Sequence, residues 1–245
     1  MPSARSGLFT GDDNQQLNFF PSPRPSIQHN RISDWVDTEL CEAIRSLQLV
    51  PGTPLSEPKL AAALNVSRAP VREALTRLAD QRLVTIVPQV GTRVAPIPMS
   101  DVVEACFIRT ALERGAFSRA IQEKSLNLDS IREVLARNTE AFARRDEHAW
   151  FESDDLLHQE VFALAGAPHV WKVIRGVKVN LDRLRRLAFP YVFDTPGILA
   201  EHTAIVDALA DRDESTGLSV ISQHANRIID ESVLFQDRFP SYFTD

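Results

Sequence analysis

Apolar residues recur every three to four positions along most of this chain, which is the spacing of amphipathic helices. Two such helices are predicted between residues 56 and 80. Asn65 separates them, because asparagine tolerates the left-handed backbone conformation that ends a helix. The inward faces of the pair are expected to carry Leu60, Ala61, Leu64, Val71, Leu75 and Leu78. The spacing therefore predicts a helix-turn-helix.

Two β-prone runs, residues 83–87 and 92–95, follow the second of these helices. The residues between them, Pro88-Gln89-Val90-Gly91, are turn-forming, so we expect an antiparallel hairpin. A hairpin that directly follows a helix-turn-helix indicates a winged DNA-binding domain. We expect this domain to span residues 31–98 and its wing to span residues 83–95.

The outer face of the second helix is predicted to carry Ser67, Arg68, Arg72 and Arg77. A helix with arginine in its first turns suits the major groove of DNA, where guanidinium groups read guanine edges or bind phosphates. We expect Arg68 and Arg72 to read bases. An arginine stripe on the solvated face of any small helical fragment would look the same, and the predicted wing favours the DNA-binding interpretation.

Helical spacing resumes after Ala95-Pro96-Ile97-Pro98, which predicts a proline-stiffened linker, and continues to the end of the chain. We expect an all-α bundle over residues 99–238, with a break at Pro190. Its helices are predicted at about residues 101–123, 128–145, 148–165, 168–189, 196–211 and 215–236. Residues 1–30 are polar and contain Pro and Ser, which indicates a flexible tail. The predicted fold is mainly α: an N-terminal winged helix-turn-helix and a C-terminal all-α helical bundle.

The chain has 245 residues, of which 44% are hydrophobic, and this is enough for two domains with buried cores. No apolar run reaches the length of a membrane span, and the N-terminus lacks the basic-then-apolar order of a secretory signal. We therefore expect a cytoplasmic protein without membrane contact. Cys41 and Cys106 lie in apolar helical patterns, which argues against a disulfide framework or a thiolate metal site.

The net charge of −6 is unusual for a protein that binds DNA, but it is unevenly distributed. Residues 31–98 hold eight basic and seven acidic side chains, whereas residues 99–245 hold 17 basic and 24 acidic ones. The acidity therefore belongs to the bundle. The modest charge of the first domain predicts that a homodimer binds the DNA operator and that binding depends steeply on salt.

Four polar side chains are predicted on apolar helix faces of the bundle. Asp154 and His158 lie four residues apart, and therefore on one face of a helix, while His202 and His224 lie on apolar stripes of two later helices. Burying three imidazoles and a carboxylate is costly unless they are satisfied, and one divalent cation would satisfy all four. A single histidine on an apolar face is more often a hydrogen-bonded core residue, so the pattern alone leaves both interpretations open.

A metal held by four protein ligands keeps one or two coordination positions open, which a small carboxylate or hydroxy-acid could occupy. Arg109 lies on the inward stripe of the first bundle helix among small residues, where it could hold the far end of such an acid. Pairing of Arg109 with Glu113 or Glu104 is an equal alternative.

Two further polar groups belong to the fourth predicted bundle helix. Asn180 lies on its inner side and is a second candidate for contact with the effector. Arg183, Arg185 and Arg186 form a basic cluster, which is expected to be a solvated or dimer-contacting face.

Residues 56–83 resemble the DNA-binding motif of the GntR-type transcription regulators, above all in Val66-Ser67-Arg68-Ala69-Pro70-Val71-Arg72-Glu73-Ala74-Leu75. The resemblance implies that Arg68 and Arg72 contact bases and phosphates. It also implies that the wing tip, with Gly91 and Thr92, approaches the minor groove. Arg82 stands where the family usually has glycine, so a residue with a Cβ is expected to adopt a positive φ there.

The bundle resembles the FCD ligand domain of the FadR-type branch of this family, whose signature is an Asp four residues before a His and one His on each of the last two helices. Asp154, His158, His202 and His224 match that order. The resemblance therefore implies a divalent metal site, in which zinc, nickel and manganese are not distinguished. Arg109 matches the Arg of the family's Arg-x-x-Leu-Glu, which borders the ligand cavity.

These features predict a DNA-binding transcription regulator, a repressor, whose bundle binds a divalent metal and a small organic acid that alters operator affinity. A metal-sensing regulator without an organic effector is one alternative. A metal-dependent hydrolase is another, since three histidines and a carboxylate could activate water. The chain contains no His-Glu-x-x-His, Gly-rich phosphate loop or nucleophile motif, so it is not expected to be an enzyme.

Overall fold

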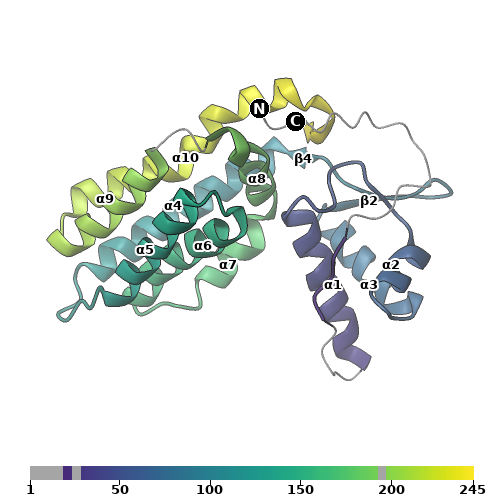
Figure 1. Cartoon of the computed structure of the whole chain (residues 1–245), viewed down its shortest axis with the longest axis horizontal. Helices are drawn as coiled ribbons and strands as arrows, with labels where there is room; N and C mark the ends of the chain where they lie inside the picture. Colours follow the sequence, from purple (N-terminus) through teal and green to yellow (C-terminus); the bar gives the residue numbers. More distant parts are fainter. Residues whose placement is uncertain (1–18, 24–28, 193–196) are drawn as a thin grey trace. The chain divides into compact units, whose positions relative to one another are not determined.

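The computed structural model describes residues 19–23, 29–192 and 197–245 and divides the chain into two compact units (Figure 1). The winged unit holds the residues up to Ala95 except Arg45–Leu47, and the helical unit holds those three residues and Pro96–Asp245. Within the described residues, no helix is both long and apolar enough to cross a membrane.

The described part of the winged unit combines α-helices with a three-stranded antiparallel sheet in the order β1-β3-β2. Its elements are α1 (His29–Arg45), β1 (Pro54–Leu55), α2 (Glu57–Ala63), α3 (Arg68–Asp80), β2 (Val84–Val87) and β3 (Gly91–Val94). The predicted hairpin is confirmed, with Val87 opposite Gly91 and Ile86 opposite Thr92. The sheet also contains β1, which pairs with β3 and is too short to produce a recognisable alternation in the sequence.

The predicted core of the helix-turn-helix is confirmed, since Leu60, Val71 and Leu78 are fully buried. Asn65 adopts the left-handed conformation predicted for it, with φ 52°. Arg82 also has the expected positive φ, 59°, two residues before β2 begins. A residue with a Cβ therefore holds a left-handed backbone conformation, at a modest energetic cost.

Only part of the predicted flexible tail can be assessed, because residues 1–18 and 24–28 lie outside the described residues. Between these segments Phe19 is buried. The Ser22 backbone N–H donates to Glu39 Oε2 at 2.7 Å. Residues 19–23 therefore contact the winged unit, in a stretch for which the sequence predicted a flexible tail.

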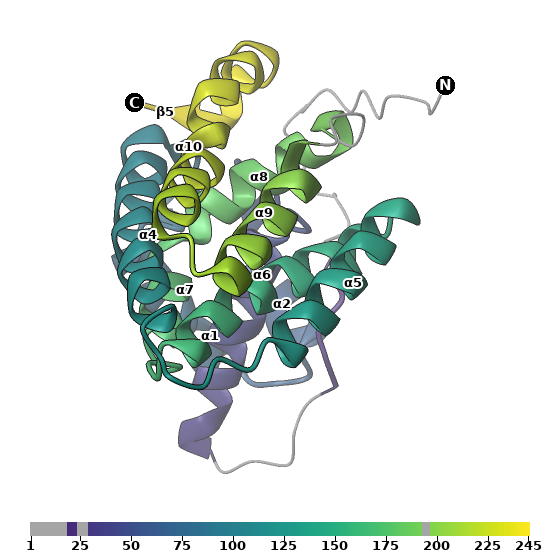
Figure 2. The same cartoon turned by 90° about the vertical axis from the view of Figure 1, so that its left-hand side faces the viewer.

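The helical unit contains seven α-helices in its described part, and Figure 2 shows α4 beside α10 and α5 beside α6. The helices are α4 (Met99–Ala120), α5 (Asp129–Ala143), α6 (Glu147–Leu164), α7 (Trp171–Val177), α8 (Val179–Val192), α9 (Gly197–Asp211) and α10 (Glu214–Arg238). The predicted all-α bundle is confirmed. Helix α10 packs tightly on α4, because a Cβ at Gly217 would lie 2.0 Å from the Phe117 ring.

The prediction of one helix over residues 168–189, followed by a break at Pro190, is wrong in two respects. The segment is two helices, α7 and α8, which are separated at Lys178. The Lys178 ammonium is buried and donates to Asp155 on α6 and to Asp182 in the first turn of α8. The break expected at Pro190 is also absent, because this proline lies inside the last turn of α8.

Part of the predicted linker forms a strand at the start of the helical unit. Ile97–Pro98 form β4, which runs parallel to β5 (Phe243–Thr244) near the C-terminus. Ile97 is fully buried and packs in a cluster with Val102, Leu181 and Phe235. The segment that follows the winged unit is therefore held by the bundle and by the end of the chain.

Candidate metal centre and nucleic-acid interface

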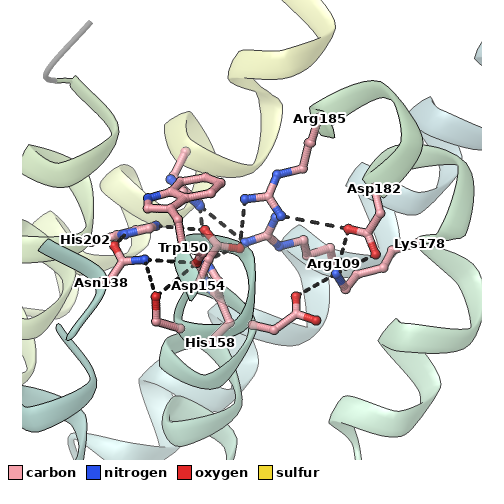
Figure 3. A network of polar contacts seen from close by, with 12 residues as sticks. Arg109, Asn138, Trp150, Asp154, His158, Lys178, Asp182, Arg185 and His202 are labelled. Carbon is pink, nitrogen blue, oxygen red and sulfur yellow. Dashed lines mark hydrogen bonds and ion pairs between the residues drawn. The ribbon is translucent and has the colours of Figure 1, made fainter. Parts of the chain in front are cut away.

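Three helices bring four potential metal ligands together in the helical unit. Helix α6 carries Asp154 and His158 on one inward face, α9 carries His202 and α10 carries His224. All four side chains are buried, and their potential ligand atoms lie within 4.8 Å of one another. Figure 3 shows Asp154, His158 and His202 converging inside the bundle. The prediction that these residues share one site is therefore supported by their positions.

Each histidine of this cluster has an acceptor facing its Nδ1 atom. The acceptors are Glu113 Oε2 at 3.2 Å from His158, Asn138 Oδ1 at 2.9 Å from His202 and Glu201 Oε2 at 3.1 Å from His224. An acceptor on Nδ1 favours the tautomer with its proton there, which leaves the Nε2 lone pair available. Carboxylate or amide oxygens behind a histidine ring are the arrangement that orients metal-binding imidazoles.

The Nε2 atoms of the three histidines and Oδ1 of Asp154 point at one another, and the Nε2 atoms of His158 and His224 also face Arg109 Nη2. His158 Nε2 lies 3.1 Å from His224 Nε2, and His202 Nε2 lies 3.3 Å from Asp154 Oδ1. In the described part of the chain neither His202 Nε2 nor Asp154 Oδ1 has a hydrogen-bond partner. Two acceptors that face each other without a proton between them repel, and a cation between them removes that cost. The residues present therefore fit a divalent metal.

Arg185 on α8 fixes the carboxylate of this cluster. Its Nη2 donates to Asp154 Oδ2 at 2.8 Å, which leaves Oδ1 for the histidine side (Figure 3). Burial alone would raise the pKa of Asp154, but the Arg185 charge and the His202 and His158 rings hold it well below its usual value. Asp154 is thus an anion at neutral pH, as a metal ligand must be.

The pKa values of the other buried groups also favour cation binding. Burial, followed by nearby positive groups, lowers the pKa of His158 and of His224, so both rings are neutral at pH 7. Burial would raise the pKa of Glu113, but the Arg109 charge and the hydrogen bonds from His158 and Arg109 outweigh it and lower the value to about 2. The cluster therefore offers neutral imidazoles backed by an ionised carboxylate.

Arg109 forms one of the ion pairs that the sequence left open, and it also borders the pocket. Its Nε donates to Glu113 Oε1 at 2.6 Å, so the expected ion pair on α4 is present. Its Nη2 lies 2.6 Å from His158 Nε2 and 3.3 Å from His224 Nε2. The guanidinium group is therefore at the edge of the cluster, where it also lines the adjoining pocket.

A pocket with an empty volume of about 450 Å³, which includes open solvent at its mouth, adjoins the cluster. Arginines, a glutamate, aromatic rings and aliphatic side chains line it. The lining residues are Arg109, Trp150, Arg185, Ala188, Phe189, Ile198, His224, Ala225, Arg227, Ile228 and Glu231. Arg109 and His224 belong both to the cluster and to the wall of this pocket.

Two expectations about α8 differ from the structure. Asn180 does not line the pocket; its amide donates to Asp101 and accepts from Arg183. The cluster of Arg183, Arg185 and Arg186 is not a solvated face, since all three side chains are 10% exposed or less. Polar residues on both sides of α8 are buried because the helix is enclosed by its neighbours, so its polarity pattern does not mark the solvent side.

The candidate nucleic-acid interface lies on α3 of the winged unit. Ser67, Arg68 and Arg72 are exposed, as predicted for the outer face. Arg72 is held by a bidentate ion pair with Glu57 of α2, with N–O distances of 3.1 and 2.9 Å. This hydrogen bonding lowers the pKa of Glu57. The pair orients the Arg72 guanidinium outward without burying it.

The remaining predicted DNA-binding residues are also at the surface. Arg77 is half-exposed and pairs with Asp34 and Glu73, so it has two competing anions nearby. Gly91 is exposed at the tip of the wing with φ 124°, a conformation that side chains with a Cβ rarely adopt, and Thr92 follows it. The DNA contacts of all these residues stay predictions.

Four site residues were not identified from the sequence: Asn138, Glu201, Arg185 and Trp150. Asn138 had a usable signal, because it lies on the buried stripe of α5 with Ile131 and Val134. Glu201 and Arg185 had no such signal in the sequence, because each contacts a cluster residue that lies on another helix.

Comparison with known proteins identifies both units. The family described as "Bacterial regulatory proteins, gntR family" matches residues 33–94, and the family described as "FCD domain" matches residues 104–227. The HTH-type transcriptional repressor RspR of Escherichia coli K12 is 35% identical over 184 residues, which cover 74% of this chain and 79% of RspR. An uncharacterised HTH-type regulator of Streptomyces ambofaciens is 31% identical over 84% of this chain and 86% of its own length.

Solved structures show the same fold. E. coli McbR/YncC superimposes with a TM-score of 0.68 at 19% identity, over 84% of this chain and 98% of McbR/YncC. A GntR-type regulator from Rhodococcus sp. RHA1 gives a TM-score of 0.66 at 24% identity, over 81% of this chain and 97% of its own. The families and the named relatives are transcription regulators, not enzymes.

Proposed function

This chain belongs to the gntR family of bacterial regulators and carries an FCD domain, and from this premise we propose its function. The proposal is that the protein is a repressor controlled by a metal-bound organic acid. The chain is a DNA-binding transcription regulator, and repressors are among its relatives. One observation carries the rest of the proposal: four buried ligand atoms converge beside a pocket edged by Arg109.

Asp154, His158, His202 and His224 would hold the metal. Three imidazole nitrogens and one carboxylate oxygen suit zinc, nickel or manganese, and such a set leaves coordination positions open. When bound, the ion supplies Lewis-acid positions for oxygen atoms of the effector. Glu113, Asn138 and Glu201 orient the three rings through their Nδ1 atoms.

Arg109 would bind the effector carboxylate. It lies between the ligand cluster and the pocket, and its charge is favourable for an anion. Arg185 and Arg227 add positive charge to the pocket wall. The pocket beside the metal ligands favours an organic effector over a regulator that senses the metal alone.

Helix α8 would carry the response toward the DNA-binding unit. Arg185 bonds the ligand Asp154, and two residues earlier Arg183 lies 3.4 Å from the carbonyl oxygen of Pro96, at the start of the helical unit. A ligand that prefers one position of α8 must bias that backbone segment as well. A coupling of about 1–3 kcal/mol would change operator affinity roughly fivefold to 150-fold.

A homodimer would bind the operator, because one recognition helix reads few base pairs. Val103 and Phe107, one turn apart on α4, are apolar and exposed, which makes them a candidate contact between two copies. Phe107→Glu is expected to yield monomers in light-scattering measurements. A dimer that persists in this variant would place the contact elsewhere.

The test is DNA binding under defined metal and acid. Chelator-treated protein is reloaded with zinc, nickel or manganese, and fluorescence anisotropy measures its affinity for an operator selected from random duplex DNA. Lactate, glycolate, succinate and mandelate are then added separately. We expect one or more acids to weaken operator binding only when the metal is present.

Arg109→Ala is the matched variant, and Arg137→Ala, an exposed residue of α5, is its control. Arg109→Ala should lose the acid response and keep operator binding without acid, whereas Arg137→Ala should behave as the parent does. A response that survives in Arg109→Ala removes this residue from effector binding. A parent protein that responds to metal but to no acid is a metal sensor instead.

A further inference from the structure

The wall of the effector pocket offers many hydrogen-bond donors and few acceptors. Arg109, Arg185 and Arg227 carry only N–H donors at their head groups, and Glu231 is the carboxylate among the described lining residues. A ligand with several hydroxyl groups needs acceptors for their protons, and this wall supplies few of them beyond Glu231 and His224. A ligand whose polar atoms are mostly acceptors fits it better.

Two of these donors are buried and lack a partner. Trp150 is 2% exposed and lines the pocket, and its indole Nε1 has no hydrogen-bond acceptor in the described segments. Arg227 donates through Nη2 to Glu201, but its Nε also lacks an acceptor there. Buried donors without acceptors cost free energy, so an acceptor oxygen on a ligand would be stabilised at this wall.

The rest of the wall is apolar and partly aromatic. Trp150 and Phe189 pack with ring centroids 4.7 Å apart, and Phe151 joins them at 4.8 and 5.0 Å. Ile198, Ala188, Ala225 and Ile228 complete the apolar lining. An apolar group that enters such a pocket leaves water and gains contact with flat rings.

We infer that the effector is a 2-hydroxy acid or related carboxylate with an apolar body, and that Trp150 Nε1–H donates to one of its oxygens. This inference rests on the proposed function, because it describes the ligand of the same metal-adjacent pocket. The carboxylate end faces Arg109 and the metal ligands, and the body lies against Trp150 and Phe189. Trp150 is then a specificity-determining residue.

The experiment compares three acids with the same 2-hydroxycarboxylate head. Mandelate carries a phenyl body, lactate a methyl group and gluconate a chain of hydroxyls. Binding to metal-loaded full-length protein is measured by isothermal titration calorimetry. We expect mandelate to bind at least about tenfold more tightly than lactate or gluconate, since only its body buries apolar area without unpaired hydroxyls.

Trp150→Phe tests the donor because it keeps an aromatic ring and removes the indole N–H together with the five-membered ring that carries it. We expect mandelate to bind about tenfold more weakly, with metal content unchanged. Trp35→Phe removes an indole N–H from α1 in the winged unit and is the matched control, with no expected change. Phe189→Leu should reduce the preference for mandelate over lactate.

The possible outcomes distinguish a failure of this inference from a failure of the proposed function. Equal or tighter binding of gluconate than of mandelate overturns the apolar ligand class and leaves an acid-controlled regulator. Unchanged mandelate affinity in Trp150→Phe overturns the donor role. Metal-loaded protein that binds none of these acids, nor succinate or glycolate, contradicts the proposed effector function itself.

Discussion

The charged side chains of the two units are used in opposite ways. In the winged unit Arg72 and Glu57 pair at the surface, where water solvates both partners and the pair is easily exchanged. In the helical unit Arg185 and Asp154 pair in the interior, where neither partner can return to water. The first arrangement keeps an arginine ready for phosphate or base edges, and the second holds a carboxylate ready for a metal.

The difference predicts where substitution matters. A surface ion pair contributes little to folding, because the Coulomb attraction only just exceeds the cost of ordering both side chains. A buried pair contributes little as a pair, but removing one partner leaves the other charged and desolvated. Substitutions in the helical unit should therefore act first on stability and metal binding, and those in the winged unit on DNA.

The largest expected effect is the loss of stability when Arg185 is replaced. Arg185→Ala should lower the free energy of unfolding by about 3–5 kcal/mol, since Asp154 is left as an uncompensated buried anion. Urea unfolding of chelator-treated protein, followed by far-UV circular dichroism, measures this change. Arg185→Lys keeps the charge and should lose less, so it reports on the same pair if the alanine variant does not fold.

The matched comparison is Arg137→Ala, which breaks an exposed ion pair with Glu133 on α5. No measurable change in unfolding is expected for it. Equal destabilisation by Arg185→Ala and Arg137→Ala would show that burial does not separate the two kinds of pair.

The next effect is on DNA binding. Arg72→Ala should weaken binding to a selected operator roughly fivefold to 150-fold and relax base preference at one position, because the guanidinium head is lost. Anisotropy titrations with the operator and with scrambled DNA measure both quantities. If Arg68→Ala and Arg72→Ala both keep the parent's affinity and preference, α3 is not the recognition helix.

A third effect is on the orientation of His202. Asn138→Leu removes the acceptor of His202 Nδ1 at similar volume and should lower metal affinity about 10–100-fold. Competition with a fluorescent chelator measures this affinity. Thr139→Ala is the control, since Thr139 is its exposed neighbour and its hydroxyl bonds only the α5 backbone among the described contacts. Unchanged metal affinity in Asn138→Leu would contradict a role for this amide in ring orientation.

The smallest effect is expected for Glu57. Glu57→Gln removes the anion that holds Arg72, so binding to non-specific DNA should tighten by no more than a few fold and operator discrimination should fall. Salt titrations against scrambled and operator duplexes measure the two changes. Weaker binding to both duplexes would show that Glu57 is needed to present Arg72.

The comparison also explains what the sequence could predict. Elements with one solvated face, such as α3 and the wing, carry a clear polarity pattern, and their residues were placed correctly. Asp154 and His158 were found because they share one helix at a spacing of four residues. His202 and His224 were found on apolar stripes of two later helices, and the resemblance to the FCD domain supported grouping them with Asp154 and His158.

Enclosed elements carried less information. Helix α8 is polar on several sides because Asp182, Arg183 and Arg185 form ion pairs and hydrogen bonds in the interior. The arginines were therefore predicted to form a solvated or dimer-contacting face, although they are buried. Asn138 and Glu201 reach their histidines from other helices, and helix-to-helix distances are not encoded in local spacing. The pairing of β4 with β5 joins residues that lie far apart in the chain.

The central claim is that the four buried side chains of the helical unit hold one divalent metal. Mass spectrometry of metal content, per mole of purified full-length protein, tests it most directly in the parent and in a His202→Ala, His224→Ala double variant. The account predicts about one equivalent of metal in the parent. The double variant should hold almost none and keep a folded winged unit that still binds DNA. A stoichiometric metal retained by the double variant, or a parent that binds none of zinc, nickel and manganese, would contradict the account.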